Sequence, residues 1–160
     1  MGCDIHGYIE YKRWPENEQP YWDFGGRFGS RDYSMFGLMA GVRQGGCIIE
    51  PRGLPKDITR QVLWEYGLYV SDEENEDDQE HTVSRERAAK WVNDGISVWL
   101  EDKLVSGPDW HTPSYLSTEE FETCLNKRKE MAWNYDFEWD AILAAMKALP
   151  NARFVFWFDN

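Results

Sequence analysis

The sequence contains little cysteine, no long hydrophobic run and no excess of positive charge. Its three cysteines, Cys3, Cys47 and Cys124, are too far apart for a Cys-x-x-Cys metal knuckle, and their odd number argues against a disulfide framework. We therefore expect a reducing, cytoplasmic setting. No signal peptide is expected, and no apolar stretch approaches the roughly 20 residues of a membrane helix, so no membrane partner is predicted. The formal charge of −12 excludes a general nucleic-acid binder, which needs basic surface to displace counterions from phosphates.

The net negative charge arises entirely in the second part of the chain. Residues 1–60 carry eight Lys or Arg against eight Asp or Glu, whereas residues 61–160 carry nine against twenty-one. Ten of the thirteen glycines also lie within residues 1–60. Exposed backbone N–H groups and a few arginine forks can hold phosphate, so this composition favours a small phosphate-bearing ligand as the partner. Glycine clusters also occur in ordinary turns, and the sequence leaves open whether the chain forms a homo-oligomer.

The length of 160 residues predicts a single domain over residues 1–160. Residues 153–158 form a nearly continuous apolar run, which predicts a central strand buried on both faces. Ser117 and Glu120 match a capping box, so a helix is expected to begin there, after a loop that holds His111 and Ser114. The predicted fold class is α+β, with a small, mostly antiparallel sheet and three to five helices. Strands are expected over residues 3–12, 47–49, 98–105 and 153–158, and helices over residues 33–42, 58–66, 84–93 and 137–149 and after Ser117.

Two Asp-x-His pairs, Asp4 with His6 and Asp109 with His111, hold two of the three histidines. Residues i and i+2 of an extended strand point to the same face, so each pair projects a carboxylate beside an imidazole. One hypothesis is that these four side chains hold a single divalent metal, Zn²⁺ or Mn²⁺, with Asp4, His6 and His111 as the catalytic groups. For the first pair, the ordinary alternative is an edge strand with a solvated polar face.

Several other residues are candidates for binding a phosphate-bearing ligand. Two prolines stiffen the loop at residues 51–55, so Arg52 and Gly53 would present a guanidinium fork and open backbone to an anion. An ordinary surface turn is the alternative there. Residues 71–80 contain seven acids and lack an EF-hand pattern, so we expect a solvated loop. The remaining candidates for the ligand site are Tyr8, Arg43, Trp110 and Ser114.

Four segments of the chain resemble a family of small uncharacterised bacteriophage proteins. They are Met1-Gly2-Cys3-Asp4-Ile5-His6, residues 31–43, Pro51-Arg52-Gly53-Leu54-Pro55 and His111-Thr112-Pro113-Ser114-Tyr115-Leu116. The resemblance spans the chain to about Glu120 and implies a phage origin and a role in the host cytoplasm during infection. Separately, Asp4-Ile5-His6-Gly7 is similar to the first metal-binding motif of calcineurin-like metallophosphoesterases, in which Asp and His ligate a metal. The chain has no Gly-Asn-His or Gly-His-x-His block to complete such a centre.

Three functions follow from these patterns. The first is a phage-type cytosolic protein that binds a small phosphate-bearing, nucleotide-like ligand and sequesters a signal of host defence. The second is a metal-dependent phosphoester hydrolase that uses the two Asp-x-His pairs. The third is an acidic adaptor or inhibitor of a host protein. The sequence favours binding slightly over hydrolysis, because the recognisable hydrolase motifs stop after the first.

Overall fold

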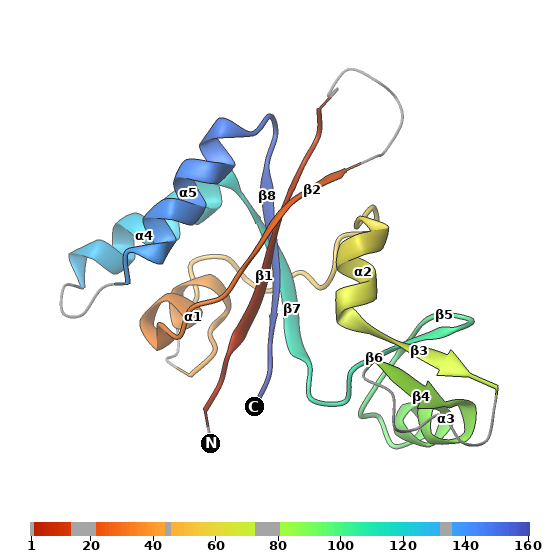
Figure 1. Ribbon diagram of the computed structural model, residues 1–160. Helices are drawn as coiled ribbons and strands as arrows, with labels where there is room; N and C mark the ends of the chain where they lie inside the picture. Colours follow the sequence, from red (N-terminus) through yellow and green to blue (C-terminus); the bar gives the residue numbers. More distant parts are fainter. Residues whose placement is uncertain (1, 14–21, 44–45, 73–80, 132–135) are drawn as a thin grey trace. The chain divides into compact units, whose positions relative to one another are not determined.

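The computed structural model describes residues 2–13, 22–43, 46–72, 81–131 and 136–160, which form two compact units (Figure 1). The first unit consists of Met1–Thr59 and His111–Asn160, and the second unit, Arg60–Trp110, is inserted between these segments in the sequence. Five helices and two four-stranded, mostly antiparallel sheets confirm the α+β class, although two sheets are present where one was predicted. The prediction of one domain over residues 1–160 stays a prediction.

The sheet of the first unit has the strand order β2-β1-β8-β7 and is antiparallel throughout. Its strands are β1 (Ile5–Tyr11), β2 (Asp23–Phe28), β7 (His111–Ser117) and β8 (Arg153–Phe158). Strand β8 is central and buried along its whole length, as predicted. The edge-strand alternative for the first strand is wrong, because β1 pairs with β2 on one side and β8 on the other.

The loop expected around His111 and Ser114 is also wrong, because this segment is strand β7. Its residues pair with β8 from Phe158 to Arg153, with an irregularity between His111 and Ser114. Strand β7 lies at the edge of the sheet, where Pro113 does not interrupt pairing on both sides. A strand was not evident from the sequence because proline and a capping signal follow each other within a few residues.

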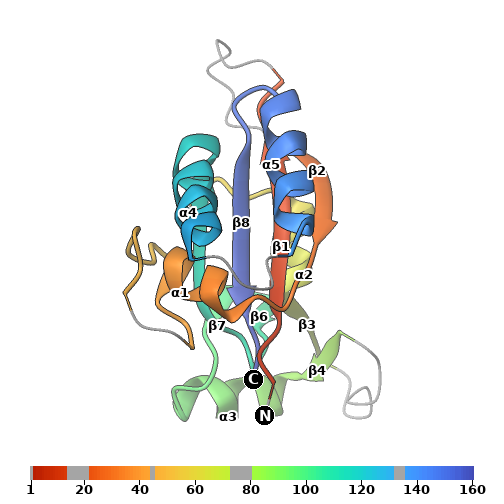
Figure 2. The same cartoon turned by 90° about the vertical axis from the view of Figure 1, so that its left-hand side faces the viewer.

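Alternation along β8 gives the sheet two different faces. Phe154, Phe156 and Phe158 belong to the main core, under α1 (Tyr33–Ala40), α4 (Thr118–Glu130) and α5 (Glu138–Ala148), which cover one face (Figure 2). Arg153, Val155 and Trp157 must then point to the opposite face. Gly7 of β1 makes this packing fit, because a Cβ there would lie 2.1 Å from Cζ of Phe154. The polar residues of β1 share the face of Arg153.

The helix caps follow the sequence closely. The Asp32 carboxylate caps α1 by accepting from the N–H groups of Ser34 and Met35, and the helix ends before Gly41, which adopts φ 69°. The capping box of Ser117 and Glu120 at the start of α4 is confirmed. The strand expected at residues 47–49 is absent from this described segment, where the N–H of Ile48 instead donates to the carbonyl of Leu38.

The second unit has its own small sheet, ordered β4-β3-β6-β5, and its own apolar cluster. Ser84 caps α3, and β5 pairs with β6 as an antiparallel hairpin where a strand was expected over residues 98–105. Of the acidic run at residues 71–80, only Ser71 and Asp72 lie within the described residues. The elements are α2 (Arg60–Tyr66), β3 (Gly67–Ser71), β4 (Thr82–Ser84), α3 (Arg85–Asn93), β5 (Trp99–Glu101) and β6 (Leu104–Ser106).

A buried ion pair joins α1 to α4 in the first unit. Nε of Arg128 lies 3.0 and 2.8 Å from the two carboxylate oxygens of Asp32, and both side chains are almost fully buried. Asp32 thus caps one helix while it neutralises a cation of another. A buried pair of this kind is costly to break on one side, because the remaining charge has no water around it.

Arg128→Ala should therefore lower the free energy of unfolding by about 3–5 kcal/mol, because it leaves the Asp32 carboxylate buried without its cation. Chemical denaturation monitored by circular dichroism would measure the loss. The matched control is Lys127→Ala, which removes an exposed cation paired with Glu130 on the same helix and should cost less than about 1 kcal/mol. Equal losses in the two variants would contradict a structural role for the buried pair.

Candidate functional site

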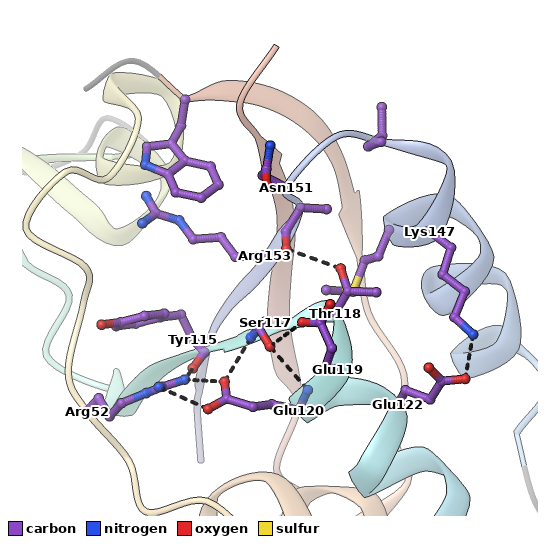
Figure 3. A pocket seen from close by; sticks show the side chains of 14 residues that line it. Arg52, Tyr115, Ser117, Thr118, Glu119, Glu120, Glu122, Lys147, Asn151 and Arg153 are labelled. Carbon is purple, nitrogen blue, oxygen red and sulfur yellow. Dashed lines mark hydrogen bonds and ion pairs between the residues drawn. The ribbon is translucent and has the colours of Figure 1, made fainter. Parts of the chain in front are cut away.

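Two cavities lie at opposite ends of the sheet of the first unit. The His6 cavity, of about 600 Å³, lies where β1 begins and β2 ends. The Arg153 cavity, of about 640 Å³, lies where β8 begins, beside the first turn of α4 and the last turn of α5 (Figure 3). The His6 cavity is lined by Asp4, Ile5, His6, Arg27, Phe28, Gly29, Ser30 and Arg31.

His6 is held in one orientation at its cavity. Its Nε2 lies 2.9 Å from Oδ2 of Asp159, and its imidazole stacks on Trp157 with ring centroids 5.9 Å apart and planes 8° apart. Asp159 is fixed in turn, because its Oδ1 accepts from the backbone N–H of Asp4. A carboxylate that holds an imidazole in this way defines which ring nitrogen can meet a ligand.

Arg31 forms a two-pronged ion pair with Asp4 at the mouth of the same cavity. Its Nε and Nη2 lie 2.5 and 2.6 Å from the two carboxylate oxygens. The hydrogen bonds from Arg31 lower the pKa of Asp4, and Asp4 raises the pKa of Arg31. The two side chains are 58% and 48% exposed, so the pair contributes little to stability and can be exchanged for another anion at small cost.

Sequence reasoning missed Arg27 and Arg31 as site residues. Arg27 is an exposed residue of β2, and Arg31 follows the turn between β2 and α1. A sequence pattern typical of an anion-binding loop was present, because two arginines lie among three glycines and a serine in Phe24-Gly25-Gly26-Arg27-Phe28-Gly29-Ser30-Arg31. Ser30 donates its hydroxyl hydrogen to Asp136. Only pairing of β2 with β1 brings these arginines beside His6.

In and beside the Arg153 cavity, cationic side chains lie against aromatic rings. The guanidinium of Arg153 lies 3.7 Å from the ring centre of Trp22 and 5.8 Å from that of Tyr115. Arg52 lies 4.3 Å from the ring of Tyr115, and Lys12 lies 4.8 Å from that of Trp22. We call these five residues the cation–aromatic stack. Cation–π contacts of this kind are strongest where water is excluded, as it is around Arg153.

Two carboxylates neutralise Arg153, which is 7% exposed. Its Nε donates to Oε2 of Glu10 at 2.6 Å, and its Nη1 donates to Oδ1 of Asp57 at 2.7 Å. Burial alone would raise the pKa of Asp57, but hydrogen bonds from Arg153 and Trp22 outweigh it and lower the pKa. Glu10 is fully buried and also accepts from the backbone N–H of Thr59. This network ties β1, β8 and the chain before the second unit together.

Arg52 was predicted to recognise an anion, but its guanidinium forms hydrogen bonds within the protein. Its Nη1 and Nη2 lie 3.2 and 2.6 Å from the two carboxylate oxygens of Glu120, and Nη2 also donates to the carbonyl of Tyr115. The hydroxyl of Ser114 accepts from the backbone N–H of Arg52. Gly53 adopts φ 76°, which supports the tight turn. Arg52, Gly53 and Ser114 therefore hold a loop against β7 and α4.

The structure places the histidines of the two predicted Asp-x-His pairs on opposite faces of the sheet. His6 stacks on Trp157 on one face of the sheet, whereas His111 stacks on Phe158, which points to the helix-covered face. Asp109 belongs to the second unit. The described residues contain no group of three or more His, Cys, Asp or Glu side chains that could hold a metal. Asp4 is paired with Arg31, and the metal site formed by the four predicted ligands stays a prediction.

The other predicted ligand-binding residues lie outside both cavity linings. Tyr8 is buried and stacks on Trp157 with ring centroids 5.0 Å apart. Arg43 donates to the carbonyl of Gly2 at 3.2 Å and lies over the ring of Tyr33. Trp110 belongs to the second unit, and its indole fills the space beside Gly107. Of the residues proposed from sequence, only Asp4 and His6 line the His6 cavity, and only Arg52 lines the other.

The Asp4–Arg31 pair predicts a pH dependence. Because the folded-state pKa of Asp4 is lowered, its small contribution to stability is present above the ordinary aspartate pKa of about 3.9 and is lost as the pH falls through the lowered value. An NMR titration of the Asp4 carboxyl carbon should show a midpoint below about 3.9, and Arg31→Gln should raise it toward that value. A midpoint that does not respond to Arg31→Gln would show that the pair is absent in solution.

Arg52→Lys should lower the free energy of unfolding by about 1–2 kcal/mol, because lysine cannot bridge both oxygens of Glu120. Thermal and urea unfolding would measure the change. Arg60→Lys is the matched control, since Arg60 pairs with Glu101 in an exposed setting, and a loss below about 1 kcal/mol is expected. A loss no larger than that of the control would leave Arg52 as an ordinary surface residue.

The two cavities of the first unit are the candidate functional sites of this chain. No described helix is both long and apolar enough to cross a membrane. The chain matches no protein-family model, no curated protein and no solved structure among those compared with it.

Proposed function

We propose that the chain binds a small phosphate-bearing ligand in the His6 cavity, with Arg27 and Arg31 as the phosphate-binding groups. The observation that carries the proposal is the charge of the lining. The lining contains two arginines and one histidine but a single acid, Asp4, although the chain as a whole has a formal charge of −12. Two further acids, Asp159 and Asp136, lie behind the lining and bond to His6 and Ser30. A planar guanidinium matches two oxygens of a phosphate, and Gly29 allows close approach of the backbone.

The exchange of one anion for another makes this binding feasible. Arg31 is already shaped to receive two oxygens, because it holds both oxygens of Asp4. Since that pair is exposed, a phosphate that replaces the carboxylate loses little. His6 supplies a polar group whose orientation Asp159 fixes, and Phe28 supplies an apolar wall for the rest of a nucleotide-like ligand.

The Arg153 cavity is a poorer site for phosphate. Its three cations, Arg52, Lys147 and Arg153, face three glutamates in the lining. Each cation is already paired with a carboxylate, and the pairs of Arg52 and Arg153 are partly or fully buried. An anion entering this cavity would have to displace a buried partner, which costs far more than displacing an exposed one.

We favour binding over hydrolysis because His6 and His111 lie on opposite faces of the sheet and Asp4 is paired with Arg31. A binder of nucleotide-like molecules could sequester a signal of host defence, and this role accords with the resemblance to bacteriophage proteins. The hydrolase alternative would need a metal held by Asp4 and His6 with ligands other than those predicted. The adaptor alternative depends on the acidic run, of which residues 73–80 lie outside the described residues.

Isothermal titration with adenosine monophosphate, inorganic phosphate and adenosine tests the proposal. The two phosphate compounds should bind and adenosine should not, and Arg27→Gln or Arg31→Gln should weaken binding about tenfold or more, as expected for a lost hydrogen bond to a charged group. Arg87→Gln, which changes an arginine of the second unit, should have no effect. Binding of adenosine as tight as that of adenosine monophosphate would overturn the proposal, and release of phosphate in the presence of Mn²⁺ or Zn²⁺ would favour the hydrolase.

A further inference from the structure

The Arg153 cavity retains a set of polar groups that the protein does not use. Nε of Arg153 donates to Glu10, Nη1 to the carboxylate of Asp57 and Nη2 to the carbonyl of Asp57, and Nη2 also lies 2.6 Å from Oε2 of Glu10. Since Nη1 carries two N–H donors, one of them has no partner among the described residues. In the described part of the chain, the hydroxyl of Tyr115 and the side-chain amide of Asn151 also form no hydrogen bond. Figure 3 shows the side chain of Arg153 extending over Tyr115 on one side of the cavity, with Asn151 above them.

A fourth group, Glu119, adds an acceptor at the edge of the same cavity. Its carboxylate accepts from the hydroxyl of Ser117 at 2.9 Å and forms no ion pair with any described residue. Hydrogen bonds from its own backbone N–H and from Ser117 lower its pKa, so it is ionised at neutral pH. Together, the four groups offer both donors and acceptors, and they are spread around an opening of about 640 Å³.

This combination suits a hydroxyl-rich molecule better than an ion. A hydroxyl can donate and accept at once, so it can satisfy the spare donor of Arg153 as well as the carboxylate of Glu119. The lining has three cations and three acids, so it carries no net formal charge that would attract an ion. An apolar patch of Met146, Leu149 and Ala152 completes the wall and can contact the C–H groups of such a ligand.

A flat base is less suitable for this cavity. Tyr115 already has two guanidinium groups near its ring, and Trp22 has a guanidinium and an ammonium group near its own. A nucleobase would have to displace a cation of the cation–aromatic stack in order to stack on either ring. Displacing Arg153 would remove the cation paired with buried Glu10 and the shorter of the two ion pairs of Asp57. A ligand in this cavity is therefore expected to form hydrogen bonds and to contact the edges, not the faces, of the Trp22 and Tyr115 rings.

We infer that the Arg153 cavity is a second binding site, for a neutral polyhydroxylated molecule such as a monosaccharide or disaccharide. Its binding groups are Tyr115, Glu119, Asn151 and Arg153. The site is separate from the proposed phosphate site, which lies at the opposite end of the same sheet. With hydrogen bonds to neutral hydroxyls as the main attraction, a dissociation constant of about 1 mM is expected for a single sugar unit.

Saturation-transfer NMR and titration with glucose, galactose, mannose, maltose and sucrose test this inference, with adenosine as the flat, uncharged comparison. At least one sugar should bind. Tyr115→Phe removes only the hydroxyl and keeps the ring of the stack, and Glu119→Gln removes the charge and keeps the shape. Each should weaken sugar binding about threefold to tenfold, the effect of one lost hydrogen bond.

Glu86→Gln is the matched control, because Glu86 is also an exposed second residue of a helix capped by serine, and it should leave sugar binding unchanged. Arg31→Gln should also leave it unchanged, so failure of the phosphate proposal and failure of this one are separable. The inference is overturned if no sugar binds, if a bound sugar responds to neither Tyr115→Phe nor Glu119→Gln, or if adenosine binds at this cavity more tightly than every sugar.

Discussion

Arg153 carries a full positive charge inside the first unit, and much of that unit is arranged to neutralise it. An unpaired buried guanidinium would cost several kcal/mol, roughly the whole stability of a small domain. Glu10 from β1 and Asp57 from the loop before the second unit supply the two counter-charges, and Trp22 covers one face of the guanidinium. The strand partner and the loop are therefore fixed by one side chain of the central strand.

The need to neutralise buried arginines also determines which cationic side chains can bind a ligand. In a chain with 29 acids and 17 basic residues, most arginines described are already paired. Arg128 and Arg153 are buried in their pairs, and Arg52 is partly enclosed between Glu120 and Tyr115. Arg31 is different, because its pair with Asp4 is exposed and inexpensive to open. Both cavities contain arginine–carboxylate pairs. Whether such a pair can open for a ligand depends on how deeply it is buried.

One face of the sheet forms the apolar core, and the other carries polar and charged side chains. One face carries the phenylalanines of β8 and packs under three helices, so it contributes the apolar burial that stabilises the unit. The other face carries Arg153, Trp157 and the polar residues of β1. His6 and Arg153, one from each cavity, both project from this polar face. The side chains proposed to bind ligands are therefore separate from the phenylalanines that form the core. His111 lies toward the core face and is separated from His6 for that reason.

The sequence by itself determined the local elements. The capping box of Ser117 and Glu120, and the apolar run of residues 153–158, depend on interactions within a few positions, and these elements appear as predicted. Tertiary structure alone decided the site. Pairing of β2 with β1 brings Arg27 beside His6, pairing of β7 with β8 turns an expected loop into a strand, and the network of Arg153 joins positions 143 residues apart. Long-range pairing and the neutralisation of buried charge leave no periodic trace in the chain, so no reading of local pattern could have supplied them.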